Sequence, residues 1–387
     1  MKDILNGHLQ AVDLKKYYHQ GSIIKNTDEL CDEIFKIILN RKEISDEPLN
    51  ARVFINGGTR DDFGSKLSNN PPRNDESLED WLKRITLQDS FCAVLNGING
   101  WSEFISNFVN RSFNIPWVAQ FGIPSKGVDV YCFMGRYSIT PFGIHLDKEH
   151  TFLYHLGPGN KKAWVWDPDE IDIKPLIKSD SFNLNETLQH AKHIVLKPGD
   201  ALFIPQNWYH VLENPTFSLT LGVAPYEMRK AEVVTSIINN FLNEGAKDND
   251  FYTFNESDDE HRALTKEFLP ETLTKKNIQQ LIPEGVNDIK HNLQSNFHFK
   301  YPSPLRKISN KKYQYFGDLV IGKDDGEKIR LHCRGKTILM KSQFTKQIIE
   351  LKSIMESPDF EYFHNCSVKK SSFTFIMEQL ICLGVLV

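Results

Sequence analysis

The sequence predicts an α+β protein in which a small antiparallel β-barrel is flanked by helices and followed by a helical region and a second, smaller domain. Short apolar or alternating segments, separated by turns rich in Pro, Gly and Asn, fill the middle of the chain. Segments with helical periodicity precede and follow this block. The length of 387 residues is sufficient for two to three domains.

Composition and charge fit a multi-domain enzyme of the cytoplasm. Hydrophobic residues make up 40% of the chain and charged residues 25%, so substantial cores are expected. The 6 cysteines contain no C-x-x-C pair, which argues against a zinc ribbon or a disulfide framework and suits a reducing compartment. The sequence contains neither a signal-peptide apolar core nor an apolar run long enough to span a membrane. The net charge of −4 provides no general attraction to nucleic acid.

The N-terminal part predicts an α/β extension of the barrel. Its apolar residues recur first at helical spacing and then in a short strand-like run. The stretch from Gly57 to Glu76, rich in Gly, Asn, Pro and charge, predicts a long surface loop. The other elements expected here are helices over Asp28–Arg41, Ser77–Arg84 and Trp101–Val109 and strands over Arg52–Asn56 and Phe91–Leu95.

Two short segments carry the residue types of a metal site. His145 and Asp147 are two apart, so in a strand both side chains face the same way and can converge on one ion. His210 follows a Pro-Gly-Asp turn, an apolar strand at Ala201–Ile204 and Pro205, which ends strand pairing. Two histidines and one carboxylate make the facial triad that holds Fe(II) and leaves positions open for a co-substrate and O2.

A hairpin between these segments contributes a cation. The strand that follows the Gly157 to Asn160 turn would place Lys162, Trp164 and Trp166 on one face. A lysine that points into a small barrel is costly unless it meets an anion, and the distal carboxylate of 2-oxoglutarate is the natural one.

Two hydroxyls are further candidates for the co-substrate pocket. Thr151 is expected on the same side as Asp147, and Thr220 lies in a later segment that alternates polar and apolar residues. Either hydroxyl can bond the co-substrate or a neighbouring strand.

The stretch from about Asp129 to Tyr226 resembles the JmjC (cupin-like) family of Fe(II)/2-oxoglutarate oxygenases. The matching motifs are Phe-Gly-Ile-His-Leu-Asp, Gly-x-x-Lys-Ala-Trp and Pro-Gly-Asp…Pro…His, in that order. The resemblance implies a double-stranded β-helix (cupin or jelly-roll) barrel and catalytic iron ligands at His145, Asp147 and His210. It also implies that Lys162 binds 2-oxoglutarate, with Lys161 as the alternative if the preceding turn shifts the register.

The expected organisation comprises three parts. Residues 1–228 form the catalytic domain, with the barrel core at about 120–228, residues 229–300 form a helical region, and residues 301–387 form a winged-helix-like domain. The resemblance to the ribosomal-oxygenase branch of the family implies that the helical region builds a homodimer interface. The expected elements are a helix from about Met228 to Gly245, an acidic linker at Asn255–Glu260, helices over Glu271–Asn296, Ser342–Glu356 and Phe373–Leu383, and strands over Gln314–Ile321 and Lys328–Cys333.

The predicted function is Fe(II)- and 2-oxoglutarate-dependent hydroxylation of a protein or peptide side chain, with a free amino acid as a further substrate class. Hydroxylation is preferred to demethylation because the sequence shows no additional zinc module or methyl-ammonium cage. Residues 301–387 hold 14 Lys and Arg against 9 Asp and Glu, without an aromatic and basic stripe. This mild excess favours packing or protein docking over nucleic-acid binding.

Two alternatives stay open on the sequence. One is a cupin-type metalloenzyme that does not use 2-oxoglutarate, against which Lys162 argues. The other is a non-catalytic binding or regulatory module, against which the complete set of three metal ligands argues.

Overall fold

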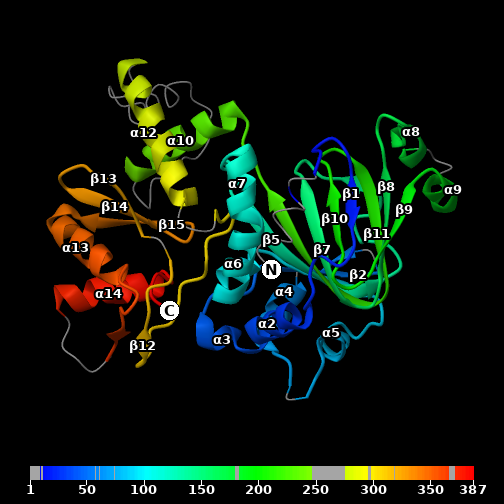
Figure 1. Cartoon of the computed structure of the whole chain (residues 1–387), viewed down its shortest axis with the longest axis horizontal. Helices are drawn as coiled ribbons and strands as arrows, with labels where there is room; N and C mark the ends of the chain where they lie inside the picture. The colour runs from blue at the N-terminus through cyan, green and yellow to red at the C-terminus, as the bar shows by residue number, and fades with distance from the viewer. Residues whose placement is uncertain are drawn as a thin grey trace, which may run out of the picture.

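The structure is a computed structural model that describes residues 9, 12–56, 58–60, 62–73, 75–178, 183–245, 275–294, 298–317, 319–365 and 371–387. Figure 1 shows a β-barrel on the right, a layer of helices beside it, and a smaller α/β unit on the left beneath helices α10 and α12. All named strands pair antiparallel. The chain therefore has the predicted α+β fold with a jelly-roll barrel.

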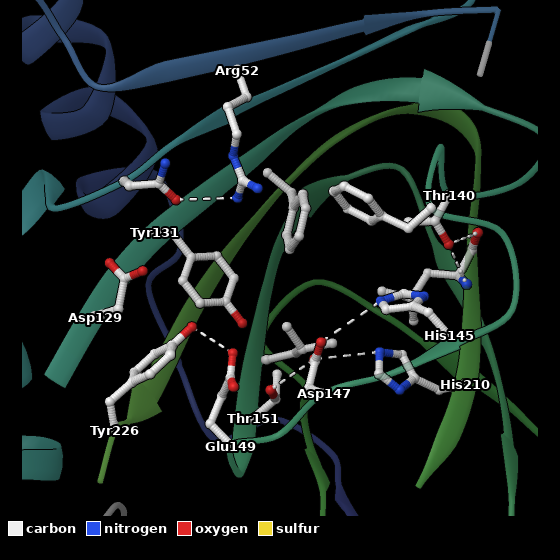
Figure 2. Close-up of a pocket in the computed structure, with 15 residues that line it drawn as sticks. Arg52, Asp129, Tyr131, Thr140, His145, Asp147, Glu149, Thr151, His210 and Tyr226 are labelled. Atoms are coloured by element: carbon white, nitrogen blue, oxygen red, sulfur yellow. Dashed lines mark hydrogen bonds and ion pairs between the residues drawn. The ribbon is translucent and has the colours of Figure 1, made fainter. Parts of the chain in front are cut away.

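The barrel is built from two sheets that share one long strand. The larger sheet has the order β1-β10-β7-β11-β5-β4-β2-β3, while β6, β8 and β9 complete the smaller one. The interior opens at one end into the cavity of Figure 2. The strands are β1 (Tyr18–Gln20), β2 (Ala51–Ile55), β3 (Gly58–Thr59), β4 (Phe91–Leu95), β5 (Val128–Tyr137), β6 (His145–Leu146), β7 (Thr151–Pro158), β8 (Lys161–Trp166), β9 (Lys192–Leu196), β10 (Ala201–Ile204) and β11 (Tyr209–Pro225).

Strand β11 joins the two sheets because its register shifts in the middle. Its first residues pair with β6 and β8, and its later residues pair with β5 and β7. Between Asn214 and Ser218 the pairing with β5 is irregular, so β11 carries more residues than its partner at this point. The irregularity turns the strand from one sheet into the other and closes the barrel around its interior.

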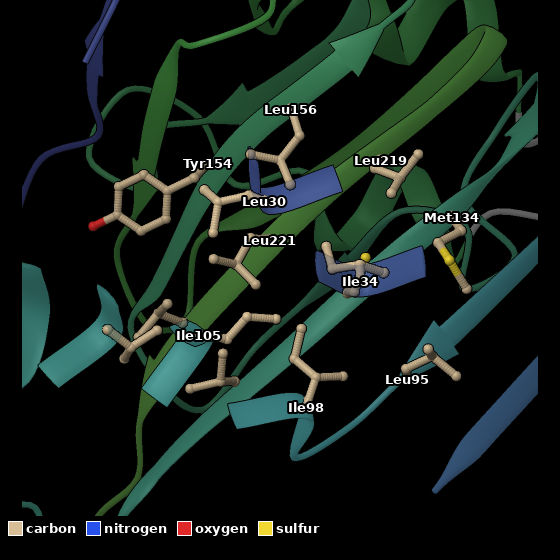
Figure 3. Packing of buried hydrophobic residues seen from close by; sticks show 14 of the residues in the cluster. Leu30, Ile34, Leu95, Ile98, Ile105, Met134, Tyr154, Leu156, Leu219 and Leu221 are labelled. Atoms are coloured by element: carbon tan, nitrogen blue, oxygen red, sulfur yellow. The ribbon is translucent and has the colours of Figure 1, made fainter. Parts of the chain in front are cut away.

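Helices cover the outer face of the larger sheet and supply most of the main core. Leu30 and Ile34 of α2 (Asp28–Leu39) are buried against Leu156, Leu219 and Leu221 of the sheet (Figure 3). The i, i+4 spacing of the two α2 residues puts them on one helix face, as the sequence predicted. The other α-helices before β5 are α3 (Arg41–Ile44), α4 (Asp62–Asn69), α5 (Leu78–Thr86), α6 (Glu103–Val109) and α7 (Ile115–Phe121).

The prediction of one long loop from Gly57 to Glu76 is wrong, because helix α4 lies within it. Phe63 and Leu67 are four residues apart and both are buried in the main core, which gives this polar stretch an apolar face. Gly, Asn and charged residues concealed that face in the sequence. The other helices and strands expected before Tyr226 lie within a few residues of their predicted bounds.

The C-terminal part contains a separate hydrophobic core between a three-stranded sheet and two helices. Its residues include Leu331, Ile348 and Leu380, all almost completely buried. The strand expected at Gln314–Ile321 begins only at Val320, and the last strand of the sheet was not predicted. The elements are β12 (Lys312–Tyr313), β13 (Val320–Asp324), β14 (Lys328–Cys333), β15 (Lys336–Lys341), α13 (Thr345–Met355), β16 (Tyr362–Phe363) and α14 (Ser372–Cys382).

Two helices connect the barrel to this unit, α10 (Lys230–Gly245) and α12 (Lys275–Gln294). The acidic linker expected at Asn255–Glu260 lies outside the described residues. Within the described part of the chain, no helix is both long and apolar enough to cross a membrane.

Candidate active site

The structure brings the three predicted metal ligands together at the mouth of the barrel (Figure 2). His145 lies on β6, which pairs with β11 so that His145 is directly opposite His210. Asp147 follows β6 directly. Its Oδ1 lies 3.9 Å from His145 Nε2 and its Oδ2 lies 3.6 Å from His210 Nε2. One ligand atom from each residue falls within 4.8 Å of the others.

Both imidazoles are held so that Nε2 faces the centre of the triad. His145 Nδ1 donates to the Gly143 carbonyl at 3.0 Å, and His210 Nδ1 donates to the Trp208 carbonyl at 3.1 Å. A carbonyl oxygen can only accept, so these contacts put the proton on Nδ1 and leave the Nε2 lone pair for a metal.

Thr151 fixes the carboxylate of the triad. Its hydroxyl donates to Asp147 Oδ2 at 3.2 Å. The sequence placed Thr151 on the same side as Asp147, and the structure places it in the wall of the same cavity. Its hydrogen bond orients Asp147.

The electrostatics of the triad fit a divalent metal. His210 is almost completely buried, and this burial, with the nearby His145, lowers the pKa of His210 to about 3. The imidazole is therefore neutral at neutral pH, which is the protonation state that binds metals. Two imidazoles and one carboxylate on one side of an open cavity are the donor set of a facial Fe(II) centre. The residues present thus fit the metal that the sequence predicted.

The cavity beside the triad has a volume of about 400 Å³ and a polar opposite wall. Asp129 in this wall is largely buried, and burial raises its pKa to about 6. In the same wall, the Tyr226 hydroxyl donates to Glu149 (Figure 2). Further lining residues are Arg52, Asn96, Tyr131, Phe133, Thr140, Phe142, Leu153 and Leu212.

Sequence reasoning missed this wall. Asp129, Tyr131 and Phe133 alternate along β5, and that period of two was the available signal. Arg52 and Tyr226 come from segments far apart in the chain, so only the folded sheet brings them together.

The structure places Lys161, and not Lys162, inside the barrel. Lys162 shares a strand face with Trp164, as predicted, but its Nζ lies 3.2 Å from Glu213 and its side chain is 37% exposed. Lys161 is completely buried, and its Nζ donates to the Tyr137 hydroxyl at 3.1 Å. The turn before β8 shifts the register of the strand by one residue from the predicted one, so Lys161 faces inward. Lys161 was the alternative that the sequence analysis left open.

The Tyr137 hydroxyl and the His155 imidazole lie near Lys161 inside the barrel. The Thr220 hydroxyl is 3.2 Å from His155 Nδ1 and does not line the cavity of the triad. The Ser218 hydroxyl is buried and makes no hydrogen bond to any of the described residues. Among the described residues, no carboxylate lies within ion-pair distance of Lys161, and burial lowers the pKa of Lys161 to about 8. A buried ammonium whose printed hydrogen bond goes to the uncharged Tyr137 hydroxyl fits an anionic ligand.

The barrel is similar to proteins of known family and structure. Residues 117–232 match the family model described as the JmjC domain. The structure of YcfD, a ribosomal oxygenase from Escherichia coli, in complex with cobalt and succinic acid is 13% identical, with 98% of this chain and 97% of that chain covered and a TM-score of 0.47. The complex of YcfD with cobalt and 2-oxoglutarate is 13% identical over 98% and 97% of the two chains, with a TM-score of 0.44. A cupin superfamily protein from Desulfitobacterium hafniense is 14% identical over 26% and 69%, with a TM-score of 0.18.

Proposed function

We propose that the protein, in which residues 117–232 match the JmjC domain model, is an Fe(II)- and 2-oxoglutarate-dependent oxygenase that hydroxylates a side chain of a protein or peptide. The observation that carries the proposal is the convergence of His145, Asp147 and His210 on one point at the mouth of the barrel. The three open positions of such a centre accommodate a bidentate co-substrate and O2.

The residues of the chain have distinct roles in this proposal. Fe(II) and 2-oxoglutarate, when bound, reduce O2 with release of succinate and CO2 and supply the oxidising power for C–H hydroxylation. His145, Asp147 and His210 would hold the metal. The backbone carbonyls of Gly143 and Trp208 keep both imidazoles in the ligating tautomer, and Thr151 keeps the carboxylate in place.

Lys161 would bind the distal carboxylate of 2-oxoglutarate. It supplies a positive charge inside the barrel, next to the Tyr137 hydroxyl. A charge-assisted contact to a carboxylate would offset the cost of burying the ammonium. In this proposal the co-substrate is the predicted one, and its contact is Lys161 in place of Lys162.

The substrate side chain would enter against the polar wall opposite the triad. Asp129, Glu149 and Tyr226 offer oxygen atoms there, and Arg52 offers a guanidinium beside them. Such a wall favours a side chain with hydrogen-bonding groups over a purely apolar one, because buried polar groups are costly to leave unpaired.

The test is succinate formation from 2-oxoglutarate by anaerobically purified protein that receives Fe(II) and then O2, with and without a peptide pool. We expect iron-dependent succinate that increases with a fraction of the pool and is abolished by His145→Ala and Asp147→Ala. His193→Ala is the matched control, because His193 is exposed and stacks on Trp164 away from the triad.

Two results would reject parts of this proposal. Full turnover in both triad variants would remove the metal site from these residues. Iron bound in the triad without any succinate would reject 2-oxoglutarate as co-substrate and favour another cupin chemistry or a binding module.

A further inference from the structure

We propose a second metal site, for Zn²⁺ or a similar divalent cation, formed by Asp288, His291 and His332 between helix α12 and strand β14. One ligand atom from each of these residues lies within 4.8 Å of the others. The group belongs to the helical and C-terminal parts of the chain and shares no residue with the JmjC domain. The proposal is therefore independent of the proposed oxygenase function.

The spacing of the residues suits one ion. Asp288 and His291 are three apart on α12, so they occupy the same helix face. His332 lies on β14 and faces them across the contact between helix and sheet, with its ring centroid 5.8 Å from that of His291. Two imidazoles and one carboxylate, with a water in the fourth position, are a common tetrahedral ligand set for Zn²⁺.

His332 provides the strongest evidence for a missing partner. Its side chain is 1% exposed, and its Nε2 makes no hydrogen bond within the described part of the chain. Asp288 Oδ1 is 3.9 Å from this nitrogen, which is too far for a hydrogen bond. A buried polar atom without a partner is costly, and a metal bound to Nε2 would satisfy this atom.

The surroundings orient both ligands towards this point. The Thr337 hydroxyl lies 2.9 Å from His332 Nδ1 and can accept its proton, which leaves Nε2 as the ligand atom. Arg330 Nε lies 3.4 Å from Asp288 Oδ2, the oxygen that does not face His332. Burial lowers the pKa of His332 to about 4, so its imidazole is neutral at pH 7.

Gly322 leaves the space that the ion requires. A Cβ placed on Gly322 would lie 2.6 Å from His332 Nε2, although the backbone of Gly322 is not in the left-handed region that favours glycine. Available space, and not backbone conformation, is therefore the reason for a glycine at this position. The site borders a cavity of about 960 Å³, which provides a path for the ion and room for a water ligand.

The experiment is zinc titration of the full chain carrying His145→Ala and Asp147→Ala, which remove the first site. We expect one equivalent of zinc by mass spectrometry of the metal after desalting, with an increase in Tm. Adding Asp288→Asn, His332→Ala or Gly322→Ala should abolish both the binding of one equivalent of zinc and the increase in Tm.

His364→Ala is the matched control. His364 is also a 1% exposed histidine of the C-terminal unit with an unbonded Nε2, but it belongs to no group of three ligands among the described residues. We expect it to retain the equivalent of zinc. Zero zinc in the parent variant would overturn the proposal, as would an equivalent that survives Asp288→Asn and Gly322→Ala. The Asp288→Asn variant keeps the result interpretable if His332→Ala fails to fold, because Asp288 lies at the surface end of the group.

Discussion

Lys161 places a positive charge inside the barrel, at a position where side chains of the opposite sheet are apolar or uncharged. Its Nζ contacts the Tyr137 hydroxyl and lies 5.5 Å from the Phe133 ring centre. Neither neighbour compensates an ammonium as a carboxylate would. The charge therefore reduces the stability of the unliganded protein and increases its affinity for an anion.

Replacing Lys161 with Met should separate these two effects. Removing a buried ammonium should raise the free energy of unfolding of the unliganded protein by about 1–3 kcal/mol. The same change should raise the KM for 2-oxoglutarate about ten- to a hundredfold, because one charge-assisted contact is lost. Urea unfolding and succinate assays check the two values.

Lys162→Met provides the control for that comparison. Lys162 is partly exposed and paired with Glu213, so its loss should leave the KM for 2-oxoglutarate unchanged. A raised KM in this variant and not in Lys161→Met would restore the original assignment of the co-substrate lysine.

Lys161 also predicts a pH dependence. Its pKa is about 8 in the folded protein and near 10.5 in an unfolded chain. Below pH 8 both states carry the proton, and the folded protein bears the full cost of burying the charge. Between pH 8 and 10.5 the unfolded chain binds more protons, so this residue makes stability rise with pH. Over the same range the affinity for 2-oxoglutarate should fall, and Lys161→Met should remove both trends in unfolding and binding titrations.

At the scale of elements, helix α2 holds the larger sheet in place. Its residues Leu30, Ile34, Ile37 and Ile38 are 1–2% exposed and belong to the main core. Figure 3 shows Leu30 and Ile34 against the sheet. On the other face of this sheet lies the interior that holds the triad and Lys161. The position of α2 therefore supports the curvature of the barrel.

Ile34→Ala should lower the free energy of unfolding by about 2–5 kcal/mol, because it removes buried methyl groups and leaves a cavity. Leu39→Ala on the same helix should cost less than about 0.5 kcal/mol, since Leu39 is 38% exposed. Denaturant unfolding measures both. Equal losses in the two variants would mean that α2 does not pack on the sheet as described.

At the scale of the whole molecule, one carboxylate ties the barrel part to the C-terminal unit. Glu103 on α6 lies 2.8 Å from Arg306 and 3.2 Å from Arg334. Arg334 is 1% exposed and also donates to the carbonyls of Gly100 and Gly384, so it joins both parts.

Glu103→Gln should leave these two arginines without their shared carboxylate and cost about 3 kcal/mol. We expect calorimetry to show an earlier unfolding transition for the C-terminal unit. Glu79→Gln, which breaks the surface pair of Glu79 and Lys83 on α5, should change the transition by less than about 0.5 kcal/mol. A single unshifted transition in Glu103→Gln would show that the two parts are joined mainly by other contacts.

The sequence alone predicted the features that depend on local pattern. The period of two along a strand placed His145 and Asp147 on one side. The turn residues after the strand Ala201–Ile204 marked the point at which His210 begins the next strand. Helical spacing located α2, α5 and α6 to within a few residues. These features depend on residues that are near each other in the chain, so a single sequence contains them.

The tertiary structure decided what depends on register and on distant segments. A single turn length determined that Lys161, and not Lys162, faces the interior, since a shift of one residue reverses every side chain of a strand. Arg52, Asp129 and Tyr226 form one wall only because β11 crosses both sheets. Asp288 and His332 meet only where α12 lies on β14. Local periodicity fixes the direction of a side chain within its own element, whereas its neighbours across the fold are set by the packing of whole elements.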